Sequence, residues 1–145
     1  MLDRKPVKLF AFLFTSLWFS ANSWAEDLPL LDASQVAHNN YGYYGLEPEI
    51  VTNYLTHGRR LGYVRVQVEL MLKDADTLEL VEHHAPLIRA TVVEILGQQS
   101  EEQIKSLAGR ETVRREIFEA INQLLAQETG QPLLANLLFA KFLYD

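Results

Sequence analysis

The stretch LGYVRVQVELMLKD, residues 61–74, has the most regular pattern in the chain. From Val64 onward, apolar side chains alternate with polar ones, among them Arg65, Gln67 and Glu69. This alternation is typical of a β-strand with one buried face and one solvated face. At about 3.3 Å per residue, ten such residues would extend roughly 33 Å, which is long for a strand.

Two further segments are predicted to be strands. The segment EIVTNYLT, residues 49–56, is rich in β-branched and aromatic residues, and the turn HGRRLG that follows makes it one arm of an antiparallel hairpin with the long strand. The segment LLANLLFAKFLY, residues 133–144, is so apolar that its period does not separate helix from strand. Its aromatic residues, and the need of the long strand for a partner, favour a strand.

The sequence between residues 74 and 99 changes to a helical period. Asp76 is expected to cap a short first helix, and Pro86 ends that helix and lies in the first turn of the next. One apolar stripe at 3.6-residue spacing defines the second helix and consists of Ile88, Val92, Ile95 and Leu96.

The next segment carries a capping box, in which Ser100 and Gln103 satisfy each other's free amides. It is expected to open a short helix that contains Leu107 and ends at Gly109.

Residues 110–127 form the clearest helical pattern, and Gly130 ends it. Its apolar face consists of Val113, Ile117, Ile121 and Leu124. On the opposite side, Glu111 and Arg115 have the spacing of an ion pair. The order is therefore β-β-α-α-α-β, an α+β fold in which helices pack on one face of a small antiparallel or mixed sheet.

The composition limits the classes of function. A chain of 145 residues with 48% apolar and 22% charged residues fits one globular domain. Its net charge of −6, without a basic stripe, is unsuited to nucleic-acid binding. The sequence contains no cysteine, which excludes disulfides, thiolate metal ligands and a cysteine nucleophile.

Residues 1–25 have the pattern of a secretory signal. A basic start, formed by Arg4, Lys5 and Lys8, precedes an apolar run. Ser23 and Ala25 are small residues at the −3 and −1 positions of a cleavage site before Glu26. The alternative is a short, retained membrane anchor, although a helix spanning ~30 Å needs about 20 apolar residues. Both interpretations place the remaining chain outside the cytoplasm.

The exported part is predicted to begin with a linker, residues 26–47, followed by a domain over residues 48–145. The linker segment HNNYGYYGLEPE reads as coil. Its tyrosines, Tyr41, Tyr43 and Tyr44, either form a binding patch or fold back onto the sheet.

No catalytic, cofactor or metal site is predicted. His83 and His84 are adjacent, so on a helix they diverge instead of chelating one metal. The acidic pairs Asp74/Asp76 and Glu101/Glu102 are interpreted as charges at helix starts. Arg59 and Arg60 form either a solvated turn or a contact for acidic partners.

The order of these pieces resembles one family. VTNYLTHGRRLGYVRVQVELML, with Asn53, Arg60 and Tyr63, is similar to the first strands of the periplasmic domain of the flagellar basal-body-associated protein FliL. The segment HAPLIRATVVEILGQQSEEQIKSLAGRETVRREIFEAIN, and the aromatic end LLFAKFLYD, resemble the later blocks of that family. Two features depart from it, namely the short leader and the final residues 142–145.

The resemblance implies a non-enzymatic periplasmic scaffold with a stomatin-like domain that supports stator and motor function in swimming motility. It implies stator or basal-body proteins as partners, self-association into a ring, and location at the inner membrane surface. The expected partner surface comprises Arg59, Arg60, Arg65, Gln67 and Glu69. Two alternatives are a stomatin-like membrane scaffold unrelated to flagella and a small extracytoplasmic enzyme or ligand carrier, for which no polar constellation is found.

Overall fold

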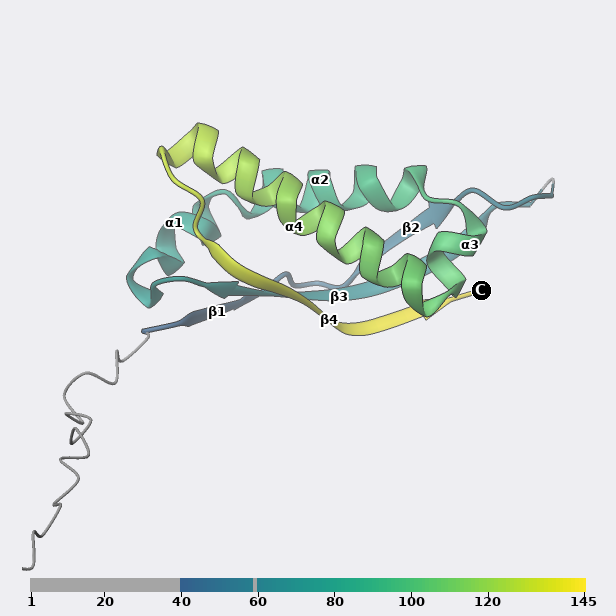
Figure 1. The fold of residues 1–145 in the computed structure, drawn as a ribbon, viewed down its shortest axis with the longest axis horizontal. Coiled ribbons are helices and arrows are strands. Elements are labelled where there is room, and N and C mark those ends of the chain that lie inside the picture. Colours follow the sequence, from purple (N-terminus) through teal and green to yellow (C-terminus); the bar gives the residue numbers. More distant parts are fainter. Residues whose placement is uncertain (1–39, 59) are drawn as a thin grey trace, which may run out of the picture. The chain divides into compact units, whose positions relative to one another are not determined.

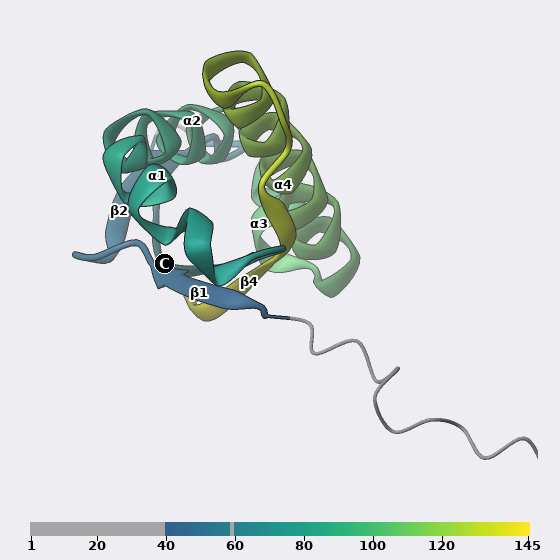
Figure 2. The same ribbon diagram turned by 90° about the vertical axis from the view of Figure 1, so that its left-hand side faces the viewer.

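The computed structural model describes residues 40–58 and 60–145 (Figure 1). Its strands are β1 (Gly42–Gly45), β2 (Ile50–Tyr54), β3 (Gly62–Leu72) and β4 (Leu134–Tyr144). Between β3 and β4 lie the 3-10 turn η2 (Ala75–Thr77) and the helices α1 (Leu78–His83), α2 (Ala85–Gln98), α3 (Glu101–Lys105) and α4 (Leu107–Thr129). The predicted α+β class, a small antiparallel sheet with helices on one face, is confirmed (Figures 1 and 2).

The long strand β3 is the centre of the sheet, and all its neighbours run antiparallel to it. β4 pairs with β3 along one edge, from Val64 to Leu72. β1 and β2 share the other edge, where β1 pairs with residues 69–72 and β2 with residues 62–66. The predicted hairpin of β2 with β3 is therefore correct, and so is the strand predicted over residues 133–144, which the structure begins at Leu134.

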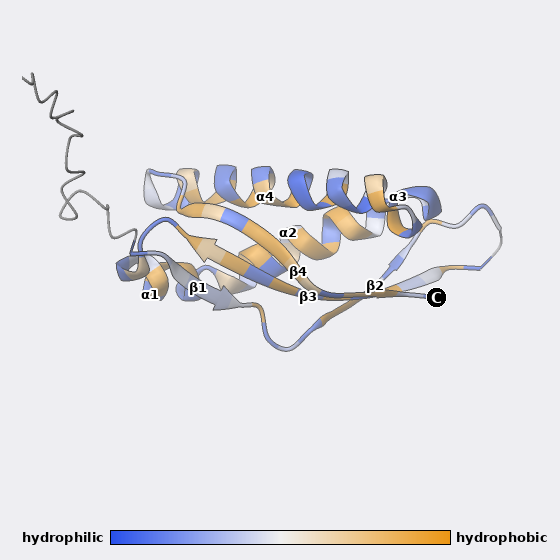
Figure 3. Cartoon of the chain, turned by 60° about the horizontal axis from the view of Figure 1, so that its bottom comes forward, coloured by the Kyte–Doolittle hydropathy of each residue, from blue (hydrophilic) through white to orange (hydrophobic). Residues whose placement is uncertain are grey.

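The alternation in β3 separates a buried face from an open one, as predicted. Val64, Val66, Val68, Leu70 and Leu72 have 0% exposed surface. Helices α2 and α4 cover this face and contribute their apolar stripes to the core (Figure 2). The fully buried helical residues are Ile88, Val92, Leu96, Val113, Ile117, Ile121 and Leu125. Figure 3, which is turned so that the lower side of Figure 1 comes forward, shows β3 and β4 in front of α2.

Residues 42–45 form β1, so the expectation of coil in this part of the linker is wrong. The strand depends on tertiary contacts, because it is short and gains its pairing only from the end of β3. Gly42 allows a close approach, since a Cβ there would lie 2.9 Å from the Cα of Ala75. Tyr44 packs against the core, whereas Tyr43 is 55% exposed, so the tyrosines fold onto the sheet without all being buried.

Two local details of the helices differ from the predictions. Asp74, not Asp76, is the cap: its Oδ1 accepts a hydrogen bond from the Asp76 N–H at 3.0 Å and opens η2. Gly109 does not end α3, because Ser106 caps α4 by accepting from the Gly109 N–H at 2.9 Å. A Cβ on Gly109 would lie 2.5 Å from the Gln103 backbone, so this glycine permits close contact between α3 and α4.

The capping box of Ser100 and Gln103 is present, and Gly130 ends α4 in the left-handed conformation with φ of 86°. Glu111 pairs with Arg114 at 2.6 Å, instead of with Arg115 as predicted. The side chain of Arg114 also reaches β4, where it donates to the Leu137 carbonyl at 2.9 Å. Because this second contact holds the Arg114 side chain in place, Glu111 pairs with Arg114 and not with Arg115.

Candidate partner-binding surface

The sheet face opposite the helices carries the predicted surface residues of β3. Arg65, Gln67 and Glu69 alternate with the buried side chains and therefore point away from α2 and α4. Arg65 is exposed, while Gln67 and Glu69 are half-buried between the neighbouring strands. The structure thus brings these three residues together on one face that no helix of the described residues covers, which we call the open face.

Glu49 organises the polar part of the open face. Its Oε2 lies 3.0 Å from the Lys141 Nζ, and its Oε1 lies 3.4 Å from the Arg65 Nη1. Glu49 precedes β2, Arg65 is on β3 and Lys141 is on β4, so the contacts cross the sheet. All three side chains retain substantial solvent exposure, between 31% and 51%. Arg65 is therefore already paired and is not an isolated positive charge awaiting a partner.

An apolar hollow adjoins this cluster and was not predicted. It has a volume of about 320 Å³ and is lined by Val51, Tyr63, Val64, Arg65, Leu143, Tyr144 and Asp145. Val51, Tyr63 and Leu143 are each more than half exposed. Val51 and Leu143 lie opposite Arg65 in the two neighbouring strands, and this register, which the sequence alone does not reveal, brings the apolar side chains of the hollow together.

Of the other predicted surface residues, Arg60 lies in the turn between β2 and β3. Arg60 is exposed there, and its carbonyl accepts a hydrogen bond from the Thr56 hydroxyl. Arg59 lies outside the described residues, as do Ala25 and Glu26 of the predicted cleavage site. Arg60 comes just before β3 in the chain, and no hydrogen bond or ion pair joins it to Arg65, Gln67 or Glu69.

Glu101 forms a small charged cluster at the start of α3. Its carboxylate contacts the Lys105 Nζ at 2.8 Å and the His57 Nδ1 at 3.4 Å. These partners, the Lys105 ammonium first, lower the pKa of Glu101 from 4.5 to about 2, and the same contact raises the pKa of Lys105. The cluster is exposed and ties the β2–β3 turn to α3. This is a structural role that agrees with the interpretation of Glu101 as a helix-start charge.

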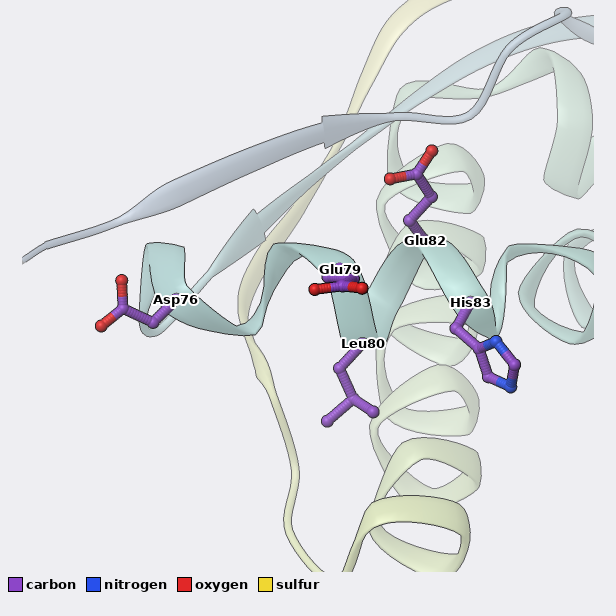
Figure 4. A pocket seen from close by; sticks show the side chains of 5 residues that line it. All are labelled: Asp76, Glu79, Leu80, Glu82 and His83. Carbon is purple, nitrogen blue, oxygen red and sulfur yellow. The ribbon is translucent and has the colours of Figure 1, made fainter.

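An acidic hollow of about 580 Å³ lies over α1, lined by Asp76, Glu79, Leu80, Glu82 and His83. These side chains diverge instead of converging on one point (Figure 4). The side chain of the neighbouring His84 contacts the backbone of α1, where its Nδ1 lies 2.8 Å from the Leu80 carbonyl oxygen. Within residues 40–58 and 60–145, no group of three or more His, Asp or Glu side chains is placed to hold a metal ion.

None of the helices in the described part of the chain combines the length and the apolar character that crossing a bilayer requires.

The fold and its surfaces together define a class of protein. It is a small α+β domain with a closed core under two helices, an uncovered sheet face and shallow hollows. Such surfaces suit contacts with other macromolecules better than the binding of a small substrate in an enclosed cleft.

Comparison with known proteins identifies the family. Residues 43–144 match the family model of the flagellar basal body-associated protein FliL. The chain is also 28% identical over 84 residues to the Flagellar protein FliL of Aquifex aeolicus (strain VF5), a match that covers 58% of this chain and 52% of that relative. The match thus spans about half the length of that relative. Because the family model covers all four strands and all four helices except the first residue of β1, the chain belongs to the FliL family.

Proposed function

We propose that this chain is a non-enzymatic periplasmic scaffold that supports the flagellar stator and motor in swimming motility. The observation that carries the proposal is the family match over residues 43–144, which spans the described domain from β1 to β4. The proposed work of the domain is to hold partners, with the open face as the contact surface. The uncovered apolar hollow beside the Glu49 cluster supports this assignment, since exposed apolar side chains beside charged ones are common at protein contacts.

The proposal includes export and location. Residues 1–25 would direct the chain across the inner membrane, with cleavage between Ala25 and Glu26, and the residues between Glu26 and β1 would connect that segment to the domain. A cleaved protein would depend on basal-body partners, or on its own ring, to stay at the motor. A ring of identical subunits multiplies weak contacts, so modest single interfaces suffice.

Deletion of the gene tests the motor role. We expect a deletion strain to spread less in soft agar and to recover when the full chain is supplied. Normal spreading and normal swimming speed in the deletion strain would remove the motor role and leave a scaffold in another system as the remaining interpretation.

A pair of variants tests the contact surface separately. Val51→Asp places a carboxylate in the apolar hollow opposite Arg65, at a position that is 54% exposed, so the fold is retained. Val93→Asp makes the same chemical change at an exposed position of α2 and is the matched control. We expect Val51→Asp alone to impair spreading at equal protein levels. Equal spreading of both variants would exclude the open face as the contact surface.

N-terminal sequencing of the protein extracted from the cell envelope tests the leader. Glu26 as the first residue, in a protein that sediments with basal bodies, is the expected result. Intact residues 1–25 in a protein that resists carbonate extraction would instead establish a retained anchor.

A further inference from the structure

The outer edge of β4, which faces away from β3, is closed by side chains of α4 over its first part. Asn122 accepts a hydrogen bond from the Leu134 N–H at 2.9 Å and donates to the Leu134 carbonyl at 3.3 Å. Arg114 donates to the Leu137 carbonyl at 2.9 Å. These two side chains act as substitutes for a neighbouring strand and satisfy backbone groups that would otherwise be unpaired.

The second part of the same edge has no such substitutes in the described structure. The Asp145 N–H donates to the Tyr63 carbonyl at 3.0 Å, and Leu143 lies opposite Arg65, so these β4 residues turn their backbone groups toward β3. In an antiparallel pair the residues between them turn the other way. The backbone N–H and C=O groups of Phe142 and Tyr144 therefore face outward, where no strand, helix or side chain among residues 40–58 and 60–145 pairs with them.

A hollow of about 420 Å³ runs beside this open part of the edge. It lies between the start of α4 and β4, and its lining consists of Leu107, Arg110, Glu111, Arg114, Leu138, Phe139 and Phe142. Leu107 is 79% exposed and Leu138 is 41% exposed, so apolar surface in the hollow is left uncovered. An added strand would bury this surface while it pairs with the backbone of β4.

The hollow also contains a positive charge without an acidic partner. The guanidinium of Arg110 stands 5.6 Å from the centre of the Phe142 ring. Its Nε is buried and lacks a hydrogen-bond acceptor, and no ion pair to Arg110 is found within the described residues. The neighbouring cations differ, because Arg114 is held by Glu111 and Lys105 is held by Glu101. A buried donor without an acceptor is costly, so a carboxylate brought to Arg110 would gain a charge-assisted hydrogen bond.

We propose that the outer edge of β4 at Phe142–Tyr144 accepts an extended segment of a partner protein as an added strand, with an acidic side chain opposite Phe142. The side chain of Phe142 points to the helix side of the sheet, since Phe142 lies opposite the buried Val66. The residue opposite Phe142 in the added strand shares that side and meets Arg110. This surface is distinct from the open face and does not depend on the proposed motor role.

A second copy of this chain fits the edge less well. Pairing of two β4 edges would bring two Arg110 guanidinium groups to one seam. The acidic residue in the hollow, Glu111, is already held by Arg114. The charges therefore favour a different, acidic strand.

The test uses the full chain and a capped seven-residue peptide with the sequence Thr-Val-Thr-Glu-Thr-Val-Thr, in which the glutamate is central. Binding of the labelled peptide is measured by fluorescence anisotropy. We expect Arg110→Gln to weaken binding about tenfold, the size of one charge-assisted hydrogen bond. Arg115→Gln, at an exposed position of the same helix, should leave binding unchanged.

Two peptide controls keep the result independent of the stability of any variant. Replacing the glutamate by glutamine should weaken binding to the unaltered chain to the same extent as Arg110→Gln. If the added strand runs antiparallel, like the rest of the sheet, the amides of the glutamate and of the two valines face β4, so N-methylation of the valine amides should abolish binding. Equal binding by the N-methylated peptide, equal binding to Arg110→Gln, or peptide-independent dimerisation through this edge would each overturn the proposal.

Discussion

The two faces of β3 show how one strand serves two purposes. On the helix side, Val66 and its alternate neighbours are fully buried, and the helices that cover them leave no room for a polar group. On the open side, Arg65 and its neighbours remain in contact with water, and Glu49 joins three strands through exposed ion pairs. The first face determines whether the domain folds, whereas the second can change without loss of the fold. Function that depends on contacts is therefore expected on the open face.

The largest effect on stability is expected from a charged residue on the buried face of β3. Val66→Asp buries an unpaired carboxylate, which should cost several kcal/mol, against the ~5–15 kcal/mol that stabilises a typical domain. Ile117→Asp, on the facing helix, should have the same effect. Gln67→Asp, the adjacent position on the open face, is the control and should retain a cooperative thermal transition. A soluble Val66→Asp protein with an unchanged melting temperature would contradict the assignment of the faces.

A smaller effect is expected where α4 closes the edge of β4. Asn122→Ala removes both hydrogen bonds to the backbone of Leu134, which should cost about 1–3 kcal/mol. The measurement is the urea midpoint, and an unchanged slope would indicate that stability alone is altered. Gln123→Ala changes the exposed neighbouring position and should have little effect. Equal midpoints for the two variants would mean that the edge does not need this closure.

A still smaller effect is expected on the open face. Glu49→Gln removes the ion pairs to Arg65 and Lys141, and exposed pairs of this kind contribute about 0–1 kcal/mol. The difference from the unaltered chain should shrink further as salt is added, because screening weakens exposed charges. A loss as large as that of Asn122→Ala would show that the open face contributes to stability as much as the helix side does.

The smallest effect concerns pH and the cluster around Glu101. Because the pKa of this carboxylate is lowered from 4.5 to about 2, its stabilising contribution is complete above pH 4.5 and is lost as the pH falls toward 2. Glu101→Gln should flatten this part of the dependence of melting temperature on pH. Lys105→Met should do so in part, since Lys105 is the main cause of the shift. Parallel curves for all three proteins would contradict the origin of the shift.

The sequence predicted the elements whose signals are local. The alternation of β3 and the capping box at Ser100 each depend only on residues that are close together in the sequence, and both are present in the structure. β1 was missed because Gly42 and Gly45, which disfavour a strand, flank its two tyrosines, and because the strand depends on β3 for pairing. Gly109 was read as a helix end because a close helix–helix approach and a left-handed cap both call for glycine, and the two are indistinguishable in one sequence.

The candidate surface was predicted in part for a similar reason. The alternation placed Arg65, Gln67 and Glu69 on one face, and the structure agrees. Their pairing could not be predicted, because Glu49 and Lys141 are brought together only by the register of β2 and β4 on β3. The apolar hollow depends on the same register. Tertiary register, unlike periodicity, leaves no trace in a short window of sequence.

The pairing of β3 with β4 has a consequence for how the domain folds. Val64 pairs with Tyr144 and Leu72 pairs with Leu134, so β3 is paired along its length with the last described strand. The described helices all lie between these two strands in the chain. Contacts of such long separation delay folding, since loop closure must precede their formation. Until β4 has paired with β3, one whole edge of β3 has no partner. The domain is therefore expected to fold in one late step. Until that step the chain remains unfolded, and an unfolded chain is able to pass through a narrow channel.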